Sequence, residues 1–339
     1  MIDFNNARIE KIAVHTVGSN EDEASKVLSL QEVSIGDTET EERLKEFFFS
    51  AFAFDQEFVF EDDTDVNLNE VYSCACEIFM DHEKLFARSV DLANHLYDVS
   101  GAGVRTGEFY TVLFRDIMVG NDRTDGIGLF KSESKDLYLE VTDDRLFSHS
   151  GTRLRKTEKG CLMLDLGRKY PHQVYVCDSS QSANSYWKKD FLSVVPAKDE
   201  YNDTVGVLTA LRDFTKKNND MNKTGRISFL NDSLQYFEEN DTYDFNNYLQ
   251  EVMPDENVGA SLKKYIEEKD LGEAFEHPFA ISDSAVNNQK KKVRNSIKLD
   301  DDIEIRISAD ADRVHDLIRQ GYDPEKQMNY YMIYFSNEK

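Results

Sequence analysis

Apolar residues in the first hundred positions follow a strand spacing first and a helical spacing afterwards. Ile9–Val17 reads as a strand, and Thr40 is a suitable cap for a helix with one apolar stripe. Glu41 and Glu42 lie near the positive end of that helix, which favours it electrostatically. A second helix with one apolar face is predicted over residues 83–99. The stripe of the first helix consists of Leu44, Phe47, Phe48, Ala51 and Phe52.

From Gly107 onward the chain carries short β-branched and aromatic runs that are separated by Gly, Asp and Asn. Such runs predict a largely antiparallel sheet that continues to about Asp178. The runs are GEFYTVLF, GLFKSES, LYLEV, GCLMLD and QVYVCD. The apolar run VYSCACEIF is also interpreted as a strand, with Cys74 and Cys76 on one face. The acidic run Glu61–Asn69 is interpreted as a solvated loop.

The second half of the chain returns to helical spacing and ends in strands. The predicted helices cover residues 203–217, 227–239, 245–252 and 260–268. Alternating isoleucines predict a half-buried strand over 303–307, and Tyr330–Phe335 predicts a final aromatic strand.

The polar, turn-rich segment Pro196–Thr204 is the best candidate domain boundary. The expected fold class is therefore α+β. Residues 1–197 would form a domain of helices and an antiparallel sheet, and residues 203–339 a mainly helical region with a C-terminal β element.

The composition is that of a folded protein, because 40% of the 339 residues are hydrophobic and 12% are aromatic. No run approaches the roughly 18 to 20 apolar residues that a membrane span needs, and the N-terminus lacks the apolar region of a secretory signal. We therefore expect a cytoplasmic protein without a membrane segment, in which the four cysteines are reduced.

The charge balance is strongly acidic, with 40 Lys and Arg against 65 Asp and Glu and a net charge of −25. Such a chain repels polyanions at long range, so the total charge alone does not predict nucleic-acid binding. Any such binding must depend on a local group of cations.

The sequence lacks the motifs of the common enzyme and metal-binding classes. The seven histidines are scattered without an HExxH pair, and Cys74 and Cys76 have no second ligand pair nearby. Gly101, Gly103 and Gly107 follow a predicted helix at GxGxxxG spacing, which is typical of turns rather than of dinucleotide binding. Neither a Walker phosphate loop nor a GxSxG elbow is present. We expect no enzyme activity and no cofactor.

One acidic run deserves a separate test as a metal site. Asp63, Asp65 and Asn67 have the spacing of a calcium loop. Leu68, however, stands where that loop needs Gly, and Cys74 where it needs Glu. The run therefore favours a solvated loop. An alternative, a metal-dependent nuclease that uses Asp62, Asp63 and Asp65, would need carboxylates converging from several elements.

Basic residues gather in one segment, QKKKVRNSIKL, which contains no acidic residue and carries a local charge of +5. Its cations are Lys290, Lys291, Lys292, Arg294 and Lys298. Five charges could bind phosphates through counterion release, whereas the alternative is a solvated face or pairing with acidic loops of the same chain. Two weaker strips consist of Arg153, Arg155, Lys156 and Lys159, and of Lys216, Lys217, Lys223 and Arg226.

Several segments together resemble the bacterial nucleoid-associated protein family of about 37 kDa, and they occur in the family's order over nearly the whole chain. The matching stretches are IGLFKSESKDLYLEV at 127–141, KGCLMLD at 159–165, YWKKDFL at 186–192, KKKVRNSIKLDDDIEIRI at 290–307 and GYDPEKQMNYYMIYF at 321–335. The resemblance implies a protein of the cytoplasm and the nucleoid that binds double-stranded DNA with little sequence preference. It implies no established catalytic site and no required cofactor.

Charge identifies the suspected phosphate contacts within the matching stretches. They are Lys131, Lys135, Lys188, Lys189, Lys290, Lys291, Lys292, Arg294 and Lys298. The alternative hypothesis is an acidic protein-interaction module that a DNA-processing partner recruits to the nucleoid. Its basis is the net charge of −25, which is concentrated at Asp55–Asp65 and Asp300–Asp302.

Overall fold

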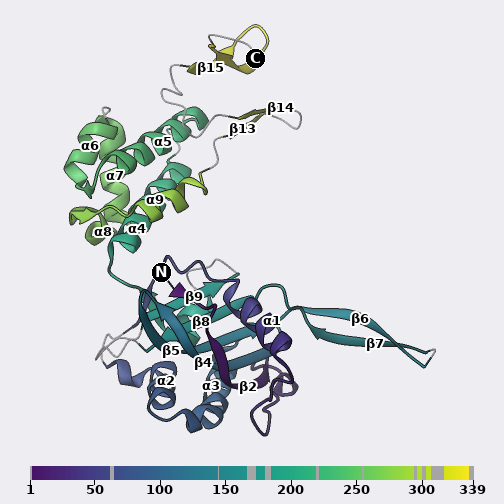
Figure 1. The fold of residues 1–339 in the computed structure, drawn as a ribbon. Coiled ribbons are helices and arrows are strands. Elements are labelled where there is room, and N and C mark those ends of the chain that lie inside the picture. The colour runs from purple at the N-terminus through teal and green to yellow at the C-terminus, as the bar shows by residue number, and fades with distance from the viewer. Residues whose placement is uncertain are drawn as a thin grey trace. The chain divides into compact units, whose positions relative to one another are not determined.

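The computed structural model shows an α+β fold, as predicted (Figure 1). Two compact units, Met1–Ala197 and Lys198–Lys339, are described one at a time below as unit 1 and unit 2. The structure describes the whole chain except residues 1, 62–64, 144, 166–172, 180–184, 219–220, 254–255, 294–295, 300–302, 307–316 and 336–339.

Unit 1 is built on an antiparallel sheet in the strand order β1-β4-β5-β8-β9-β3-β10, with β2 also paired to β4. The predicted strand over 9–17 and the predicted antiparallel sheet after Gly107 are confirmed. The strands are β1 (Ile2–Asp3), β2 (Arg8–Val17), β3 (Phe58–Phe60), β4 (Gly107–Val119), β5 (Asp122–Ser132), β8 (Lys159–Leu164), β9 (Gln173–Asp178) and β10 (Val194–Pro196).

Helices cover both faces of this sheet, which explains why β4 is buried at every position from Phe109 to Phe114. Phe109 and Leu113 join the core with α2 and α3, whereas Val112 and Phe114 join the core with α1. The helical elements of unit 1 are η1 (Glu23–Ser25), α1 (Thr38–Phe49), η2 (Val66–Leu68), α2 (Glu70–Met80), η3 (His82–Lys84), α3 (Leu85–Val99) and the π-helix η4 (Tyr186–Leu192).

The first predicted helix is confirmed with shifted ends. It begins at Thr38, because the Asp37 carboxylate accepts the Thr40 backbone N–H and caps the helix, and it ends at Phe49. The second predicted helix is confirmed as η3 followed by α3.

The predicted strand VYSCACEIF is wrong, because this run forms helix α2. Its buried residues Val71, Ala75 and Ile78 have helical spacing, and the Asn69 side chain caps the helix by accepting the Tyr72 N–H. The predicted acidic loop over 61–69 contains the short helix η2, and its residues 62–64 lie outside the described residues. Phe58–Phe60 alternates and enters the sheet as β3 between β9 and β10.

Two further strands, β6 (Lys135–Thr142) and β7 (Arg145–Thr152), form a hairpin of their own that projects from unit 1 (Figure 1). We call this hairpin the arm. Among the described residues its strands pair only with each other. The four cysteines of the chain are free thiols.

Unit 2 is mainly helical, and its four predicted helices are confirmed as α4 to α7. The helices are α4 (Glu200–Lys217), α5 (Lys223–Glu239), α6 (Phe245–Val252), α7 (Glu256–Glu268), α8 (Gly272–Glu276) and α9 (Asp283–Lys290). Three small antiparallel strand pairs complete the described part of the unit. β11 (Thr242–Tyr243) pairs with β12 (Phe279–Ala280) across α6 to α8, while β13 (Ser296–Leu299) pairs with β14 (Ile303–Arg306) and β15 (Ile318–Asp323) with β16 (Met328–Ile333). The two predicted strands near the C-terminus are confirmed as β14 and β16.

Candidate nucleic-acid interface

Lys131, one of the suspected phosphate contacts, is fully buried in unit 1. Its ammonium donates to the Arg105 carbonyl at 2.9 Å, to Glu133 at 3.1 Å and to the Tyr186 hydroxyl at 3.1 Å. Burial lowers the pKa of Lys131, and the neighbouring Glu133 opposes this effect. The ammonium is enclosed by protein groups, so it is not placed to meet a phosphate.

The other predicted cations of unit 1 differ in their surroundings. Lys135 forms an ion pair with Glu108 at 2.8 Å at the base of the arm. Lys188 is half-buried over the Phe58 ring, and burial lowers the pKa of its ammonium. Lys189 is exposed and forms no ion pair with a described residue. Lys189 is thus the predicted cation of unit 1 that is most open to a ligand.

In unit 2 the basic segment begins at the end of α9. Lys290 forms an ion pair with Glu238 in the last turn of α5 at 2.9 Å, so it is partly neutralised. Lys291 and Lys292 are exposed and form no ion pair with a described residue. Arg294 lies outside the described residues, and of Lys298 only the backbone in β13 is described.

The basic segment runs along α5 from its end toward its beginning. Lys290 contacts Glu238 near the C-terminus of α5, and seven residues later Ile297 packs on Ile227 near its N-terminus. The segment thereby reaches the part of the weaker strip that contains Lys223 and Arg226. Folding therefore brings Ile297, in the basic segment, beside Ile227, which is 70 positions earlier in the sequence.

A hollow of about 760 Å³ lies at the N-terminal end of α5, where this segment arrives. Its lining consists of Met221, Asn222, Lys223, Arg226, Leu299, Ile303, Gln320, Gln327, Met328, Asn329, Tyr330 and Tyr331. We call it the α5 hollow. None of these described lining residues is Asp or Glu, although acidic residues outnumber basic ones in the chain.

The lining of the α5 hollow combines two cations, side-chain amides and aromatic rings. Lys223 and Arg226 can meet phosphates, the side-chain amides can bond phosphate and sugar oxygens, and the tyrosines offer faces for stacking. The positive end of the α5 dipole adds a favourable field for anions. Asn222 fixes that helix end by accepting the Gly225 N–H at 2.8 Å.

Arg226 is held in place by the chain that precedes α5. Its guanidinium donates to the Met221 carbonyl at 3.1 Å and to the Asn218 carbonyl at 2.9 Å. These bonds fix its position at the hollow without neutralising its charge, because carbonyl oxygens are uncharged.

Three of the six remaining cations of the weaker strips form ion pairs with described residues. Lys159 is buried against Asp178 at 2.9 Å, Arg153 pairs with Asp136, and Lys216 pairs with Asp213 at 2.8 Å. For these three residues, the alternative prediction of pairing with acidic residues of the same chain therefore applies.

Sequence reasoning missed the polar and aromatic half of the α5 hollow. Tyr330 and Tyr331 were expected to form an aromatic strand, and β16 confirms the strand. Their adjacency was the available signal, because neighbouring strand residues face opposite sides and two adjacent tyrosines cannot both enter one core. Tyr330 is 44% exposed, which leaves its ring accessible to a ligand.

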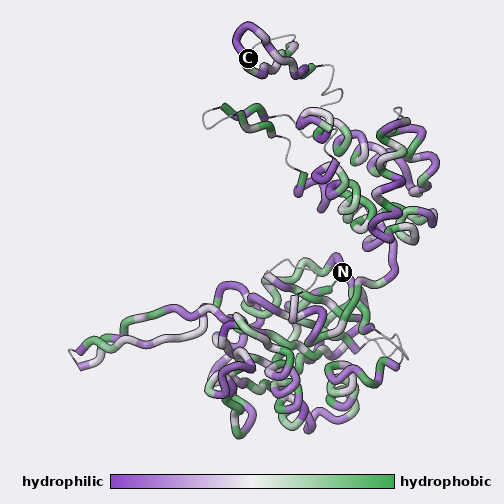
Figure 2. Tube along the Cα trace, turned by 180° about the vertical axis from the view of Figure 1, so that it is seen from behind, coloured by the Kyte–Doolittle hydropathy of each residue, from purple (hydrophilic) through white to green (hydrophobic). Residues whose placement is uncertain are grey.

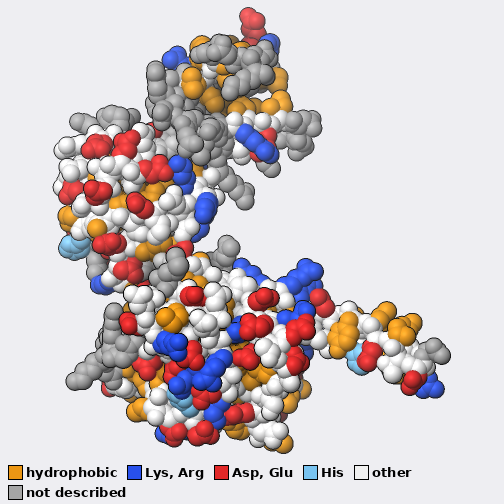
Figure 3. Space-filling model, viewed as in Figure 1, with side chains coloured by type: hydrophobic (Ala, Val, Ile, Leu, Met, Phe, Trp, Pro, Cys, Tyr) orange, Lys and Arg blue, Asp and Glu red, His pale blue; other side chains and the backbone are white. Residues whose placement is uncertain are grey.

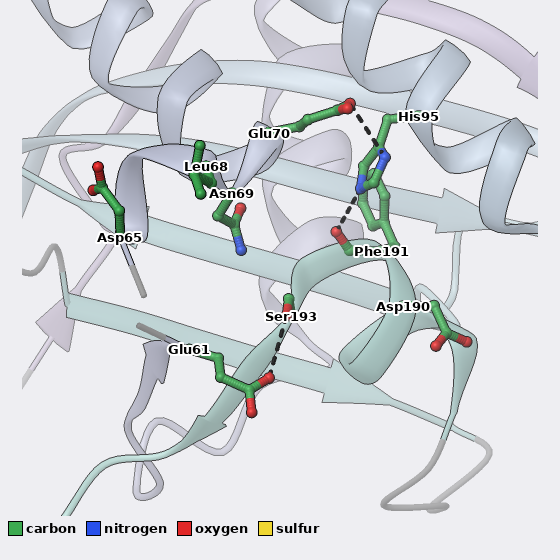
Figure 4. Close-up of a pocket in the computed structure, with 9 residues that line it drawn as sticks. All are labelled: Glu61, Asp65, Leu68, Asn69, Glu70, His95, Asp190, Phe191 and Ser193. Atoms are coloured by element: carbon green, nitrogen blue, oxygen red, sulfur yellow. Dashed lines mark hydrogen bonds and ion pairs between the residues drawn. The ribbon is translucent and has the colours of Figure 1, made fainter. Parts of the chain in front are cut away.

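A second pocket, of about 420 Å³, lies in unit 1 and is acidic (Figure 4). Its carboxylates come from different elements: Glu61 follows β3, Asp65 caps η2, Glu70 begins α2 and Asp190 lies in η4. We call it the acidic pocket. Figure 4 shows Glu70 directed at the His95 ring, with an oxygen 3.2 Å from Nδ1.

His95 and Ser193 complete the wall of the acidic pocket. His95 Nε2 lies 3.0 Å from the Phe191 carbonyl, and the Ser193 hydroxyl donates to Glu61 at 3.4 Å. Asp62 and Asp63, which the metal hypothesis used, lie outside the described residues. Within the described ranges, no group of three or more His, Cys, Asp or Glu side chains could hold a metal ion.

The family model described as Nucleoid-associated protein YejK (NA37) matches residues 13–328 of the chain. The chain belongs to this family. The resemblance drawn from the ordered segments is thereby confirmed, and the match includes both units and all the suspected phosphate contacts. No curated protein matches the chain.

Membership of the YejK family supports a role at the nucleoid. No described helix combines the length and the apolar composition that crossing a bilayer requires.

Proposed function

We propose that this YejK family member binds double-stranded DNA along α5, through backbone contacts with little sequence preference. The contacts would come from the α5 hollow at one end of the helix and from Lys291 and Lys292 at the other. Phosphate contacts position a protein on DNA without reading its sequence. Lys291 and Lys292 would make contacts of this kind, which agrees with binding that has little sequence preference.

The observation that carries this proposal is the lining of the α5 hollow. A chain with a net charge of −25 has about three acidic residues for every two basic ones, yet the described lining contains two cations and no carboxylate. The positive end of a helix dipole lies at the same place. Because the rest of the chain repels DNA at long range, the binding should be weak at high salt and short-ranged.

Fluorescence anisotropy with two short duplexes of unrelated sequence tests the proposal. We expect Lys291→Ala with Lys292→Ala to weaken binding equally for both duplexes and to reduce the slope of log K against log salt by about 0.9 per lost phosphate contact. The matched control is Lys263→Ala with Lys264→Ala, which removes two adjacent exposed lysines from α7 of the same unit. An equal effect of both double variants, or no binding at low salt, would reject the proposal.

A second candidate function is recruitment by a basic protein, and the acidic pocket is the observation that favours it. Glu61, Asp65 and Asp190 line the pocket together with Glu70, and a Lys or Arg side chain of a partner would complement them. Chemical crosslinking in a nuclease-treated lysate would test this. We expect Glu61→Gln with Asp190→Asn to lose the captured partner, whereas Glu239→Gln, an exposed acid in α5, should keep it. Recovery of no protein partner would reject this function.

A further inference from the structure

The ring of Tyr330 lies against the backbone of the neighbouring strand. Gly321 of β15 pairs with Tyr330 of β16, and the Tyr330 ring occupies the space beside the Gly321 Cα. A Cβ at position 321 would lie 2.8 Å from the ring atom Cε1 and closer still to Cζ and Oη. The absence of a side chain at Gly321 therefore leaves the room in which the ring is held.

The other side of the Tyr330 ring is open. Tyr331, the next residue, packs with Ile227 and Ile297 in the small core beside α5. Neighbouring strand residues face opposite sides, so Tyr330 points away from that core, and 44% of it is exposed. An aromatic ring that is held on one side and open on the other is a suitable surface for stacking of a planar group.

The surroundings of the ring indicate that this planar group is a nucleic-acid base. Tyr330 lines the α5 hollow together with Lys223 and Arg226, and the described lining contains no Asp or Glu. Figure 2 shows hydrophilic and hydrophobic residues interspersed along the C-terminal hairpin, and Figure 3 shows apolar side chains at its surface. Aromatic rings beside cations are the combination with which proteins bind single-stranded nucleic acid.

A base can stack on Tyr330 only if one of its faces is free. Within a duplex the neighbouring bases cover both faces, so a protein ring reaches a base that is unpaired or that lies at an end. The volume of the α5 hollow, about 760 Å³, falls within the range of about 300–1,000 Å³ that is usual for small-molecule sites. The hollow therefore has the size for a nucleotide unit of a strand.

We propose that the α5 hollow binds an unpaired nucleotide of a DNA strand, whose base stacks on Tyr330 while its phosphates meet Lys223 and Arg226. This inference rests on the proposed function and deepens it, because it assigns to the same hollow a preference for DNA with unpaired bases, as at a gap or a frayed end. Gly321 is a positioning residue, since it touches the ring and not the DNA.

Fluorescence anisotropy of the full chain with three matched probes tests the inference. The probes are a blunt duplex, the same duplex with a short single-stranded tail, and the same duplex with a tail of abasic units. The abasic tail keeps the phosphates and lacks the bases. We expect the native chain to bind the tail with bases at least about fivefold more tightly than the abasic tail, because stacking of one base contributes about 1 kcal/mol or more.

Variants of the hairpin locate this preference. Tyr330→Ala should lower the affinity ratio of the two tails to about 1, whereas Tyr330→Trp should keep it. Gly321→Ala should lower the ratio as well, because the added methyl group displaces the Tyr330 ring while a strand tolerates alanine. The matched control is Tyr334→Ala, since Tyr334 is similarly exposed at 48%, does not line the α5 hollow and has Arg319 over its ring. Unchanged circular dichroism would show that each variant is folded.

The outcomes separate this inference from the proposed function. Equal affinity of the native chain for the two tails, or a ratio that survives Tyr330→Ala, would overturn the inference and leave duplex binding in place. Binding of the tailed probe without binding of the blunt duplex would support the inference and reject the proposed function. If free deoxyadenosine monophosphate displaces the tailed probe as well as an unlabelled strand does, the ligand is a free nucleotide, and the assignment to DNA is overturned.

Discussion

Replacing the buried Lys131 separates a structural role of this residue from the DNA contact that the sequence suggested. Lys131→Met removes the ammonium from Glu133, whose side chain is only 9% exposed, and from Tyr186. Breaking one side of a buried pair costs about 3–5 kcal/mol. We expect the lower end, about 3 kcal/mol, because Arg105 stays 3.4 Å from the Glu133 carboxylate.

Urea unfolding followed by the fluorescence of Trp187 measures this loss in unit 1 alone. Trp187 is the single tryptophan of the chain, it is fully buried, and its indole N–H donates to the Gly160 carbonyl at 3.3 Å. The control Lys135→Met breaks an exposed ion pair and should cost no more than about 1 kcal/mol. Adding Glu133→Gln to Lys131→Met should recover part of the loss, because no unpaired charge then stays buried.

The DNA affinity of folded Lys131→Met should equal that of the native chain. A loss of stability below about 1 kcal/mol would refute the reasoning from burial. So would a loss of DNA affinity as large as that of the Lys291 and Lys292 double variant.

Two further predictions concern the core of unit 1. Phe48→Ala should cost about 3–5 kcal/mol in urea unfolding, since Phe48 is fully buried and stacks on Phe130 with centroids 4.2 Å apart, and a loss under about 1 kcal/mol would contradict this packing. Burial lowers the pKa of His15 below its ordinary 6.5, so the unfolded chain binds the proton more readily and stability should fall as the pH drops below 6.5. Unfolding across this range should show a weaker pH dependence in His15→Gln, and an unchanged slope would assign the dependence to other groups.

Much of the fold could be predicted because the spacing of apolar residues within a segment indicates whether that segment forms a helix or a strand. The helix over 203–217 and the strand over 9–17 show the spacing of their buried positions directly in the sequence. VYSCACEIF misled because Val, Tyr and Cys are typical strand residues, while the spacing of Val71, Ala75 and Ile78 was the better guide.

The candidate interface could be predicted only in part. A run of lysines is visible in any sequence, so the segment from Lys290 was found. The burial of Lys131 was not visible, because it depends on Arg105 and Tyr186, which are 26 and 55 positions away. The α5 hollow depends in the same way on Tyr330, which reaches the start of α5 only in the folded chain.

The surroundings of the arm could not be predicted from its sequence. LYLEV predicted a strand of the sheet, and the strand is present as β6. An alternation of apolar and polar residues predicts that one face of a strand is apolar. It does not predict which surface covers that face. Here no described residue of the chain covers Leu137, Leu139 or Val141.

Lysine footprinting by acetylation and mass spectrometry, with and without duplex DNA, tests most directly whether α5 is the DNA-binding face. The account predicts that DNA protects Lys223, Lys291 and Lys292, while Lys263 and Lys264 on α7 react as before. Protection confined to Lys188 and Lys189 of unit 1, or measurable DNA binding without protection of the lysines along α5, would contradict it.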